Sequence, residues 1–325
     1  MKLSVREDVF PIAGAFTISR GTRTESRVVT VTVSDGDVTG WAECYPYARY
    51  DETVDSVMAE IQAMAAALAG GMDRITLQSA MSPGAARNGV DCALWDLEAK
   101  RTGKRVWELA GLPEPRPEIT AYTLSLEDPD VMRVKAAENA HRPVLKIKLG
   151  GAGDIERLQA VRAGAPDAKI VVDANEGWDA GTYAQIAPVV LDLGVAMVEQ
   201  PLPAADDGAL NGMDRPLPVC ADEACHDRAS LPALAGKYDM INIKLDKTGG
   251  LTEALALKAE AEAMGLKIMV GCMIGSSLGM APATLVAQGA EVVDLDGPLL
   301  LASDRDNPLT YDAAGVHPPA ANLWG

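Results

Sequence analysis

Long hydrophobic runs are missing from the 325-residue sequence, which has no uninterrupted apolar stretch near the ~20 residues that cross a bilayer. Near the N-terminus, Lys2 and Arg6 are basic, but Glu7 and Asp8 follow and no apolar segment of the signal-peptide kind comes after them. We therefore expect neither a transmembrane helix nor a secretory signal peptide.

Positive charge is also scarce, with 29 Lys and Arg against 46 Asp and Glu, which gives a formal net charge of −17. Nucleic acids and anionic membranes are bound through clustered Lys and Arg side chains. The sequence therefore predicts no nucleic-acid partner and no membrane partner. A small acidic substrate stays possible in principle, because a local basic site can lie within an acidic protein.

A cysteine framework is the third missing feature. The five cysteines are an odd number without a regular spacing, which favours reduced thiols in a cytoplasmic protein. Cys220, Cys225 and His226 lie near one another in the sequence, but their spacing does not fit a zinc knuckle and no second cysteine pair follows. We therefore disfavour a zinc site.

The first 110 residues have the pattern of an α+β unit within a chain that is 48% hydrophobic and 23% charged, as expected for a folded protein. Residues 27–34 and 39–44 are β-rich and flank a turn at 35–37, which predicts a hairpin. A polar loop with Arg20 and Arg23 is expected between Phe16 and Ser26. Helices are predicted over 51–68 and 85–102.

From the proline-rich connector 113–117 onward, short apolar strands alternate with helical segments. We place the domain boundary there, with domains at 1–115 and 116–300, and expect the tail 301–325 to pack back on the first domain. Helices are expected at 155–163, 181–193, 251–264 and 277–288. Strands are predicted at 119–124, 144–149, 169–173, 196–199, 217–221, 240–244, 267–271 and 292–296. Eight parallel βα units in ~180 residues predict a closed (β/α) barrel.

Charged residues recur where these strands end, which is the end that carries the chemistry in such barrels. Asp173, Glu199 and Asp222 follow three consecutive strands, so their carboxylates can converge on one hard cation such as Mg²⁺. The alternative is three separate helix N-caps. Glu199 makes a poor cap because Pro201 follows it so closely.

Lys146 and Lys148 point to one face of the strand VLKIKLG, and Lys244 ends the strand four positions further around the ring. The structural alternative is an exposed edge strand, in which both lysines lie in solvent and have no catalytic role. In a closed ring of eight strands, however, Lys148 and Lys244 are diametrically opposed and flank the carboxylates. A lysine base must be neutral, and a nearby cation together with Lys146 would lower the pKa of such an amine. Two opposed bases predict racemisation or epimerisation beside a carboxylate, with β-elimination or cycloisomerisation as one-base variants.

These motifs resemble the enolase superfamily in its muconate-lactonising subgroup. The resemblance rests on KIK at 146–148, DAN at 173–175, EQP at 199–201, ADE at 221–223 and KLDKTGG at 244–250. It implies a modified TIM barrel, (β/α)7β, with an N-terminal α+β capping domain. It also implies one Mg²⁺ per subunit on Asp173, Glu199 and Asp222, with Lys148 and Lys244 as the acid/base pair and Lys146 in support.

Within the subgroup the chain resembles the dipeptide epimerases, particularly the bacterial L-Ala-D/L-Glu epimerases of murein-peptide metabolism. Asp294 and Asp296 lie two apart on the last strand, so both carboxylates can meet the ammonium group of a dipeptide. The resemblance further implies that Arg20 or Arg23 pairs with the side chain of the epimerised residue. An N-acylamino-acid racemase or a cycloisomerase is the alternative within the superfamily. Family members often assemble, which leaves a homo-oligomer open.

A serine hydrolase is the alternative from another class, because residues 275–279 match the nucleophile-elbow pattern G-x-S-x-G around Ser277. Asp294 and His317 follow in the chain order of such a triad. That reading leaves the lysines and the three carboxylates unexplained. We expect Ser276 and Ser277 instead to lie near the substrate backbone or to cap the following helix.

Overall fold

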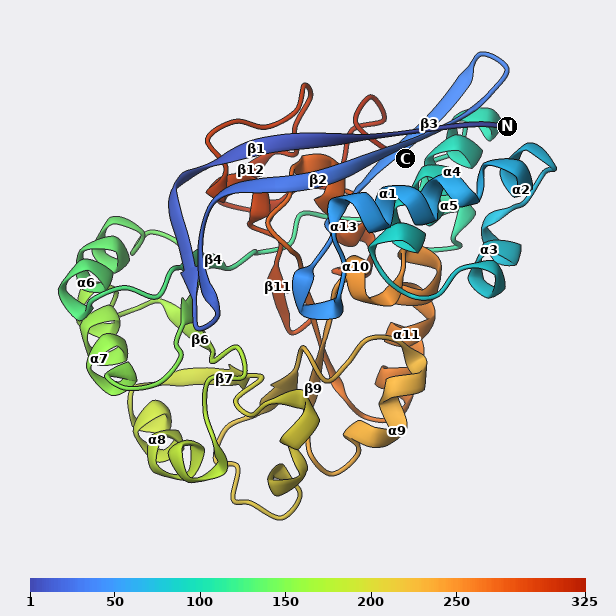
Figure 1. Cartoon of the computed structure of the whole chain (residues 1–325). Coiled ribbons are helices and arrows are strands. Elements are labelled where there is room, and N and C mark those ends of the chain that lie inside the picture. The colour runs from blue at the N-terminus through green and yellow to red at the C-terminus, as the bar shows by residue number, and fades with distance from the viewer.

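The computed structural model describes residues 1–325 and contains an N-terminal antiparallel sheet above an eight-stranded parallel barrel (Figure 1). The antiparallel sheet has the order β1 (Lys2–Ile18), β2 (Gly21–Asp35), β3 (Val38–Cys44). The turn expected at 35–37 joins β2 to β3, as the sequence predicts. This sheet and the helices that follow it form a cap over one end of the barrel.

The polar segment between Phe16 and Ser26 is not the loop that the sequence suggested. β1 continues to Ile18 and β2 begins at Gly21, so the two strands pair almost to the tip of the hairpin. The segment can be polar because most of its side chains are exposed and it leaves the sheet as a two-stranded ribbon. Figure 1 shows this ribbon bending down from the cap toward the barrel.

The helices of the cap pack beneath its sheet. They are α1 (Val54–Ala63), α2 (Ala65–Ala69), α3 (Arg74–Ala80), α4 (Ala85–Thr102) and α5 (Val106–Leu109). α4 has the predicted bounds, whereas the helix predicted over 51–68 is divided at Met64. α4 approaches β3 so closely that a Cβ atom at Gly40 would lie 2.3 Å from the carbonyl oxygen of Ala93. Glycine at this position therefore allows the helix to pack on the sheet.

The barrel contains the eight parallel strands that the sequence predicts, in sequential order. They are β4 (Tyr122–Leu124), β5 (Val144–Lys148), β6 (Lys169–Asp173), β7 (Val195–Glu199), β8 (Val219–Ala221), β9 (Met240–Ile243), β10 (Lys267–Gly271) and β11 (Val292–Asp294). The backbone N–H of Ala121 donates to the Val293 carbonyl at 2.8 Å, and a parallel bridge joins Thr120 to Val293. These contacts join the first strand region to the last, so the barrel closes.

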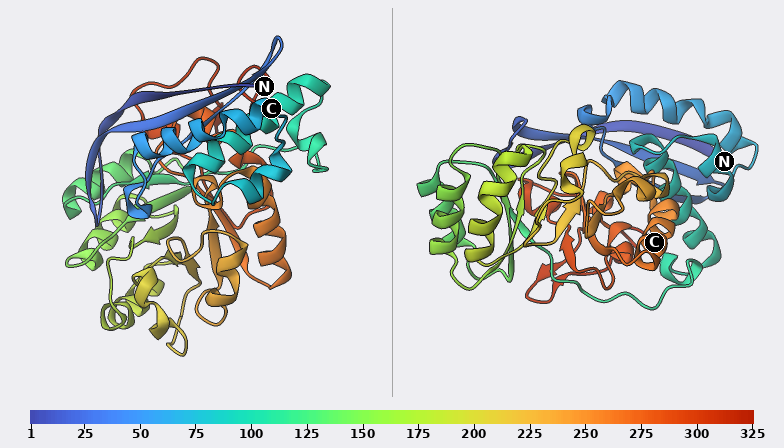
Figure 2. Two further views of the ribbon diagram at one scale, coloured as in Figure 1. Left: turned by 45° about the vertical axis from the view of Figure 1, so that its right-hand side comes forward. Right: turned by 90° about the horizontal axis from the view of Figure 1, so that it is seen from below.

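Helices cover the outside of the barrel unevenly (Figure 2). The helices are α6 (Pro129–Glu138), α7 (Asp154–Gly164), α8 (Ala180–Asp192), α9 (Leu231–Leu234), α10 (Leu245–Thr248), α11 (Leu251–Ala263), α12 (Ser277–Met280) and α13 (Ala283–Val286). Only the short 3-10 turns η2 (Ala204–Asp206) and η3 (Gly208–Leu210) lie between β7 and β8. The helix predicted over 277–288 is divided into α12 and α13, and Pro282 immediately precedes the first residue of α13. The fold is the predicted modified TIM barrel with a cap.

The C-terminal segment returns to the cap. Ala302 donates its N–H to the Pro11 carbonyl at 2.8 Å, and the Trp41 indole donates to the Leu323 carbonyl at 2.6 Å. The segment includes η5 (Gly297–Leu300), β12 (Tyr311–Asp312) and β13 (Gly315–Val316). Both chain ends lie on the cap side of the molecule (Figure 1). None of the helices combines the length and apolar character required to cross a membrane.

Candidate active site

The interior of the barrel has two layers that differ sharply in polarity. The lower layer is a buried apolar cluster with one residue from each of six strands: Val171, Met197, Cys220, Met240, Met269 and Val292. We call this cluster the apolar floor. Side chains two residues further along a strand point to the same face. On β6 and β7 those residues are Asp173 and Glu199, so the same alternation that builds the floor directs charge into the layer above it.

Asp173, Glu199 and Asp222 meet in this upper layer, as the sequence predicts. All three are buried, and one carboxylate oxygen from each lies within 4.8 Å of the others. An all-oxygen donor set of this kind fits Mg²⁺, which takes few protein ligands and leaves positions for water and substrate. The three carboxylates therefore converge on one place that a divalent cation can fill.

The electrostatics of the three carboxylates also fit a cation. Burial raises the pKa of Glu199, and the charge of Asp173 adds to that effect, so its pKa is about 7. Burial alone would also raise the pKa of Asp173, but the ammonium groups of Lys148 and Lys146 outweigh it and hold that pKa at about 2. Crowded carboxylates repel one another unless positive charge lies among them. A divalent cation would supply that charge.

Lys148 and Lys244 lie at the carboxyl ends of β5 and β9, four strands apart in the barrel, and both line one cavity. The Lys148 ammonium donates to Asp173 Oδ2 at 2.6 Å, and the Lys244 ammonium donates to Asp222 Oδ2 at 2.7 Å. Burial opposes the charge on Lys244, but Asp222 and Glu199 outweigh that effect and raise its pKa well above the usual value. Each lysine is thus held in place by a carboxylate of the cluster, and at Lys244 these carboxylates reverse the lowered pKa that the sequence argument expected.

Lys146 lies behind the carboxylates and is not part of the cavity wall. Its ammonium group is 2.7 Å from Asp294 Oδ2, 2.7 Å from Glu199 Oε2 and 3.3 Å from Asp173 Oδ2. The side chain is 1% exposed. Lys146 therefore contacts two of the three candidate metal ligands and compensates their charge from the barrel interior.

The cavity lies between the cap and the barrel and is partly open to solvent. The cap contributes Phe16, Ile18, Arg20, Gly21, Arg23, Tyr45 and Tyr47 to its wall. The barrel contributes Lys148, Asn175, Asp222, Glu223, Lys244, Cys272, Met273 and Ile274. A ligand in this cavity would therefore meet the lysines on the barrel side and arginines with aromatic rings on the cap side.

The two arginines of the hairpin differ in their partners. Arg20 is paired with carboxylates of the barrel, at 2.8 Å from Glu223 Oε1 and 3.3 Å from Glu176 Oε2. Arg23 donates to the Tyr45 hydroxyl and forms no ion pair within the chain. The positive charge of Arg23 is therefore left for an anionic ligand, whereas that of Arg20 is already balanced.

Asp294 and Asp296 are both buried, but their surroundings differ from the prediction. β11 ends at Asp294, so Asp296 does not share a strand face with it and instead precedes the turn η5. Asp296 Oδ2 accepts a hydrogen bond from the Thr123 N–H at 2.6 Å. Neither carboxylate lines the cavity, although Asp294 Oδ1 has no hydrogen-bond partner.

Cys272 lines the cavity and lies near these two carboxylates. Burial, followed by the charges of Asp294 and Asp296, raises the pKa of the Cys272 thiol well above its usual value. Burial and the neighbouring Asp294 likewise raise the pKa of Asp296 to about 7. The two carboxylates are thus close to each other and to this part of the cavity wall.

The serine-hydrolase alternative is not supported. The Ser277 hydroxyl donates to Asp304, and the Ser276 hydroxyl donates to Glu43. Ser276 caps α12, as expected, by accepting from the Leu278 N–H. His317 Nε2 lies 2.9 Å from Asp312 Oδ2, and Asp294 accepts from the Lys146 ammonium, so the partners of a triad with Ser277 are engaged elsewhere. Both serines are fully buried outside the cavity wall, so neither can meet a substrate there.

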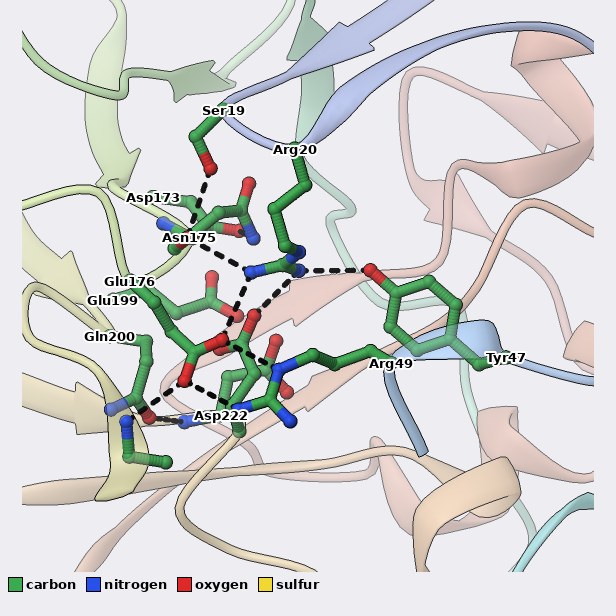
Figure 3. Close-up of polar contacts among 12 residues, drawn as sticks. Ser19, Arg20, Tyr47, Arg49, Asp173, Asn175, Glu176, Glu199, Gln200 and Asp222 are labelled. Carbon is green, nitrogen blue, oxygen red and sulfur yellow. Dashed lines mark hydrogen bonds and ion pairs between the residues drawn. The ribbon is translucent and has the colours of Figure 1, made fainter. Parts of the chain in front are cut away.

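The structure adds polar residues that the sequence reasoning missed. Glu223 and Asn175 line the cavity, and Lys247 donates to Asp222 Oδ1 at 2.6 Å. Asn242 donates to Glu199 Oε1 at 2.6 Å. Three of these residues lie in motifs that the sequence analysis had already identified: Glu223 in ADE, Asn175 in DAN and Lys247 in KLDKTGG. Figure 3 shows that Arg20, Asn175 and Glu176 meet next to the carboxylate cluster.

Comparison with known proteins identifies relatives along the whole chain. Residues 1–111 match the family described as "Mandelate racemase / muconate lactonizing enzyme, N-terminal domain", and residues 131–319 match "Enolase C-terminal domain-like". The chain is 45% identical to the L-Ala-D/L-Glu epimerase of Escherichia coli (strain K12), over 97% of this chain and 99% of that one. It is 42% identical to an N-acetyl-D-glutamate racemase from Pseudoalteromonas, over 92% and 95%.

Solved structures give the same picture. An enolase family member from Agrobacterium tumefaciens with homology to dipeptide epimerases, solved with sodium and L-Ala-L-Glu, has a TM-score of 0.97 and 56% identity over 99% of both chains. A dipeptide epimerase from Cytophaga hutchinsonii, solved with Mg and D-Ala-L-Val, has a TM-score of 0.91 and 25% identity. That comparison covers 100% of this chain and 95% of the other.

Proposed function

Because the chain belongs to the mandelate racemase/muconate lactonizing enzyme family of the enolase superfamily, we propose that it is a Mg²⁺-dependent dipeptide epimerase. The reaction inverts the α-carbon of the C-terminal residue of the dipeptide. One observation carries this proposal: Lys148 and Lys244, four strands apart in the eight-stranded barrel, line one cavity beside a cluster of three buried carboxylates. A hydrolase or a simple peptide-binding protein has no use for that arrangement.

Asp173, Glu199 and Asp222 are the residues that would hold the metal, since their oxygens converge within 4.8 Å. When bound, Mg²⁺ would stabilise the negative charge that develops on the substrate carboxylate as the α-proton leaves. Lys146 adds a fixed positive charge behind Glu199 and Asp173, so the cluster keeps its orientation. This preorganisation lowers the cost of the charged intermediate.

Proton transfer is the task of the two lysines. One lysine, in its neutral form, removes the α-proton from one face of the substrate, and the opposite lysine, in its ammonium form, returns a proton to the other face. The α-carbon is inverted because the two amines lie on opposite sides of the cavity. Lys148 and Lys244 exchange roles when the opposite stereoisomer enters, so the reaction runs in both directions.

The substrate that the cavity supports best is L-Ala-D/L-Glu. Arg23 is the residue that would bind the glutamate side chain, because its charge is not paired within the chain. Arg20 would support this charge from its position between Glu176 and Glu223. Asp294, which has one unpartnered oxygen, and Asp296 would attract the ammonium of the first residue from behind Cys272. Relatives at 45% and 34% identity carry the name L-Ala-D/L-Glu epimerase.

Further assignments belong to this proposal. A role in murein-peptide metabolism fits the proposed substrate. A cytoplasmic location fits five cysteine thiols that form no disulfide. The domain boundaries at 1–115 and 116–300 and a homo-oligomeric state also stay predictions.

The decisive experiment is incubation of the Mg²⁺-loaded protein with L-Ala-L-Glu and with L-Ala-D-Glu in D₂O. We expect one deuterium at the glutamate α-carbon, detected by mass spectrometry, together with appearance of the other stereoisomer by chiral chromatography. L-Ala-L-Gln, which has the same shape without the charge, should exchange more slowly. N-acetyl-L-glutamate tests the racemase alternative. Absence of exchange across a library of L-Ala-X dipeptides would overturn the proposal.

A further inference from the structure

Two segments of the cap and one loop of the barrel meet at Glu176, outside the cavity wall. Glu176 lies in the loop between β6 and α8, and its side chain is 9% exposed. Arg49, which belongs to the 3-10 turn η1 (Ala48–Tyr50), binds both carboxylate oxygens, with Nε and Nη2 each at 2.9 Å. Arg20 of the hairpin lies 3.3 Å from Oε2. One carboxylate therefore joins two cap segments to the barrel (Figure 3).

The backbone at this junction is strained. Asn175 and Glu176 have φ values of 46° and 64°, in the left-handed region that residues with a Cβ atom seldom adopt. Such a conformation persists only where neighbouring contacts hold it. The Ser19 hydroxyl and Arg20 Nη1 donate to the Asn175 carbonyl at 3.0 Å and 2.9 Å, and the Ala204 N–H donates to Glu176 Oε1 at 2.8 Å. The tip of the hairpin supplies two of these contacts.

The same loop reaches the carboxylate cluster through Asn175. The Asn175 backbone N–H donates to Asp173 Oδ1 at 2.9 Å, and its side-chain amide donates to Asp173 Oδ2 at 3.1 Å. A docked hairpin therefore supports Asn175 from above while Asn175 orients Asp173 from the side. Contacts between the cap and Glu176 are connected in this way to the geometry of the site below.

We propose that Glu176 is a positioning residue that, with Arg49, latches the β1–β2 hairpin over the cavity and so sets the affinity for the substrate. The inference rests on the epimerase function proposed above for the same cavity. Neither Glu176 nor Arg49 lines the cavity, so both act through Arg20 and the hairpin. The bidentate geometry gives the pair its directional strength.

The latch predicts a specific kinetic signature. Substrate is enclosed only when the hairpin is docked, so the apparent dissociation constant rises in proportion as the docked fraction falls. Glu176→Gln keeps the shape of the side chain and an acceptor for the Ala204 N–H, but it removes the charge that both arginines bind. We expect KM for L-Ala-L-Glu to rise by about tenfold, while kcat is unchanged or higher because the cavity opens more readily for product release.

Arg228 and Glu253 provide a matched control. They form a similar fork, with Nε to Oε1 at 3.0 Å and Nη2 to Oε2 at 2.9 Å, and have comparable exposure. This pair links the 3-10 turn η4 (Arg228–Ser230) to α11 and does not touch the cavity. Glu253→Gln should therefore leave KM and kcat unchanged. Equal KM values for Glu176→Gln and Glu253→Gln would overturn the proposal, as would a fall in kcat at constant KM.

Arg49→Gln tests the partner without changing the strained loop. We expect KM to rise by about as much as in Glu176→Gln. In the double variant KM should rise no further than in either single variant, because both changes remove the same interaction. If the two increases in KM multiply in the double variant, the residues act separately and the latch is wrong.

Trypsin gives a readout that does not depend on epimerase activity. It cleaves after Arg20 and Arg23, which lie at the hairpin tip, and mass spectrometry identifies each site. Cleavage there should be about tenfold faster in Glu176→Gln and Arg49→Gln than in the wild-type protein or Glu253→Gln, because the undocked fraction of the hairpin is larger. Unchanged cleavage would refute the latch even if dipeptides are epimerised. Faster cleavage in a protein that epimerises no dipeptide would support the latch and contradict the proposed epimerase function instead.

Discussion

The apolar floor and the charged layer of the barrel lie only two residues apart on the same strands, yet they have opposite chemistry. Val171 and Met197 belong to the floor, whereas Asp173 and Glu199 follow them on β6 and β7 in the layer above. Every residue of both groups is buried. Burial stabilises the first group, because apolar surface leaves water, and opposes charge on the second.

This difference separates stability from activity within one interior. The floor packs side chains from six strands and closes the lower part of the barrel. The layer above contains carboxylates whose charge is compensated by lysines, and a bound cation would add to that compensation. Changes to the charged layer should therefore affect catalysis first, and changes to the floor should affect unfolding first.

Removal of either opposed lysine should have the largest effect. Lys148→Ala and Lys244→Ala should each lower the rate of epimerisation by at least about 10³-fold, because a positioned base is lost. Each single variant should still exchange the α-proton of one stereoisomer in D₂O, since one lysine remains on one face. Chiral chromatography measures epimerisation, and mass spectrometry measures exchange.

A lysine outside the cavity serves as the control for these variants. Lys258 is half-buried and donates to the carbonyl oxygens of Val286 and Gln288. Lys258→Ala should keep the wild-type rate of epimerisation. A near wild-type rate in Lys148→Ala or Lys244→Ala would show that the two opposed amines are not the acid/base pair.

Removal of the metal should have the next largest effect. EDTA should abolish epimerisation, and added Mg²⁺ should restore it. Because only the folded protein presents the three carboxylates together, Mg²⁺ at 100 times its dissociation constant should stabilise the fold by about 2.7 kcal/mol. Thermal unfolding with and without Mg²⁺ measures this shift. Asp173→Asn should reduce both the shift and the activity, whereas Met269→Ala should leave the shift intact.

The charged layer was predictable because its positions follow from a simple periodicity. Carboxylates at strand ends, such as Asp173, and lysines such as Lys244 are readable once the strands are placed, since residues two apart share a face. The eight strands themselves are short apolar runs at regular spacing. The family motifs then supplied the roles of these residues, which spacing alone left open between a metal site and helix caps.

Contacts between the cap and the barrel could not be predicted in the same way. Arg20 and Glu223 are far apart in the sequence and meet only because the hairpin bends over the barrel. The hairpin strands beyond Phe16 were missed because residues 17–25 are polar or glycine except for Ile18, so they lack the sustained alternation that indicates a half-buried strand. Asp296 was misplaced because a strand end is set by backbone pairing, which stops at Asp294.

Truncation of the floor should lower stability without a direct effect on chemistry. Met269 is fully buried on β10, and Met269→Ala should lower the free energy of unfolding by about 2–5 kcal/mol through lost contacts and a residual cavity. Met264 is 47% exposed, so Met264→Ala should change the free energy of unfolding by less than about 0.5 kcal/mol. Urea unfolding measures both. A large fall in kcat for folded Met269→Ala would mean that the two layers are not separable.

The smallest effect concerns the pH dependence of stability, which should differ between the layers. Burial and the neighbouring Asp294 raise the pKa of Asp296 to about 7 in the folded protein, above the usual value of 3.8. The folded state therefore holds this proton more tightly than the unfolded chain, and the stabilisation is fully present below the unfolded pKa. It is lost as pH rises through the folded pKa, with a slope of at most about 1.4 kcal/mol per pH unit. Asp296→Asn should flatten this decline in urea unfolding between about pH 4 and pH 7. Met269→Ala should instead shift the free energy of unfolding by the same amount at every pH, because no proton is involved. An unchanged slope in Asp296→Asn would show that Asp296 stays charged in the folded protein and that its proton does not distinguish the two layers.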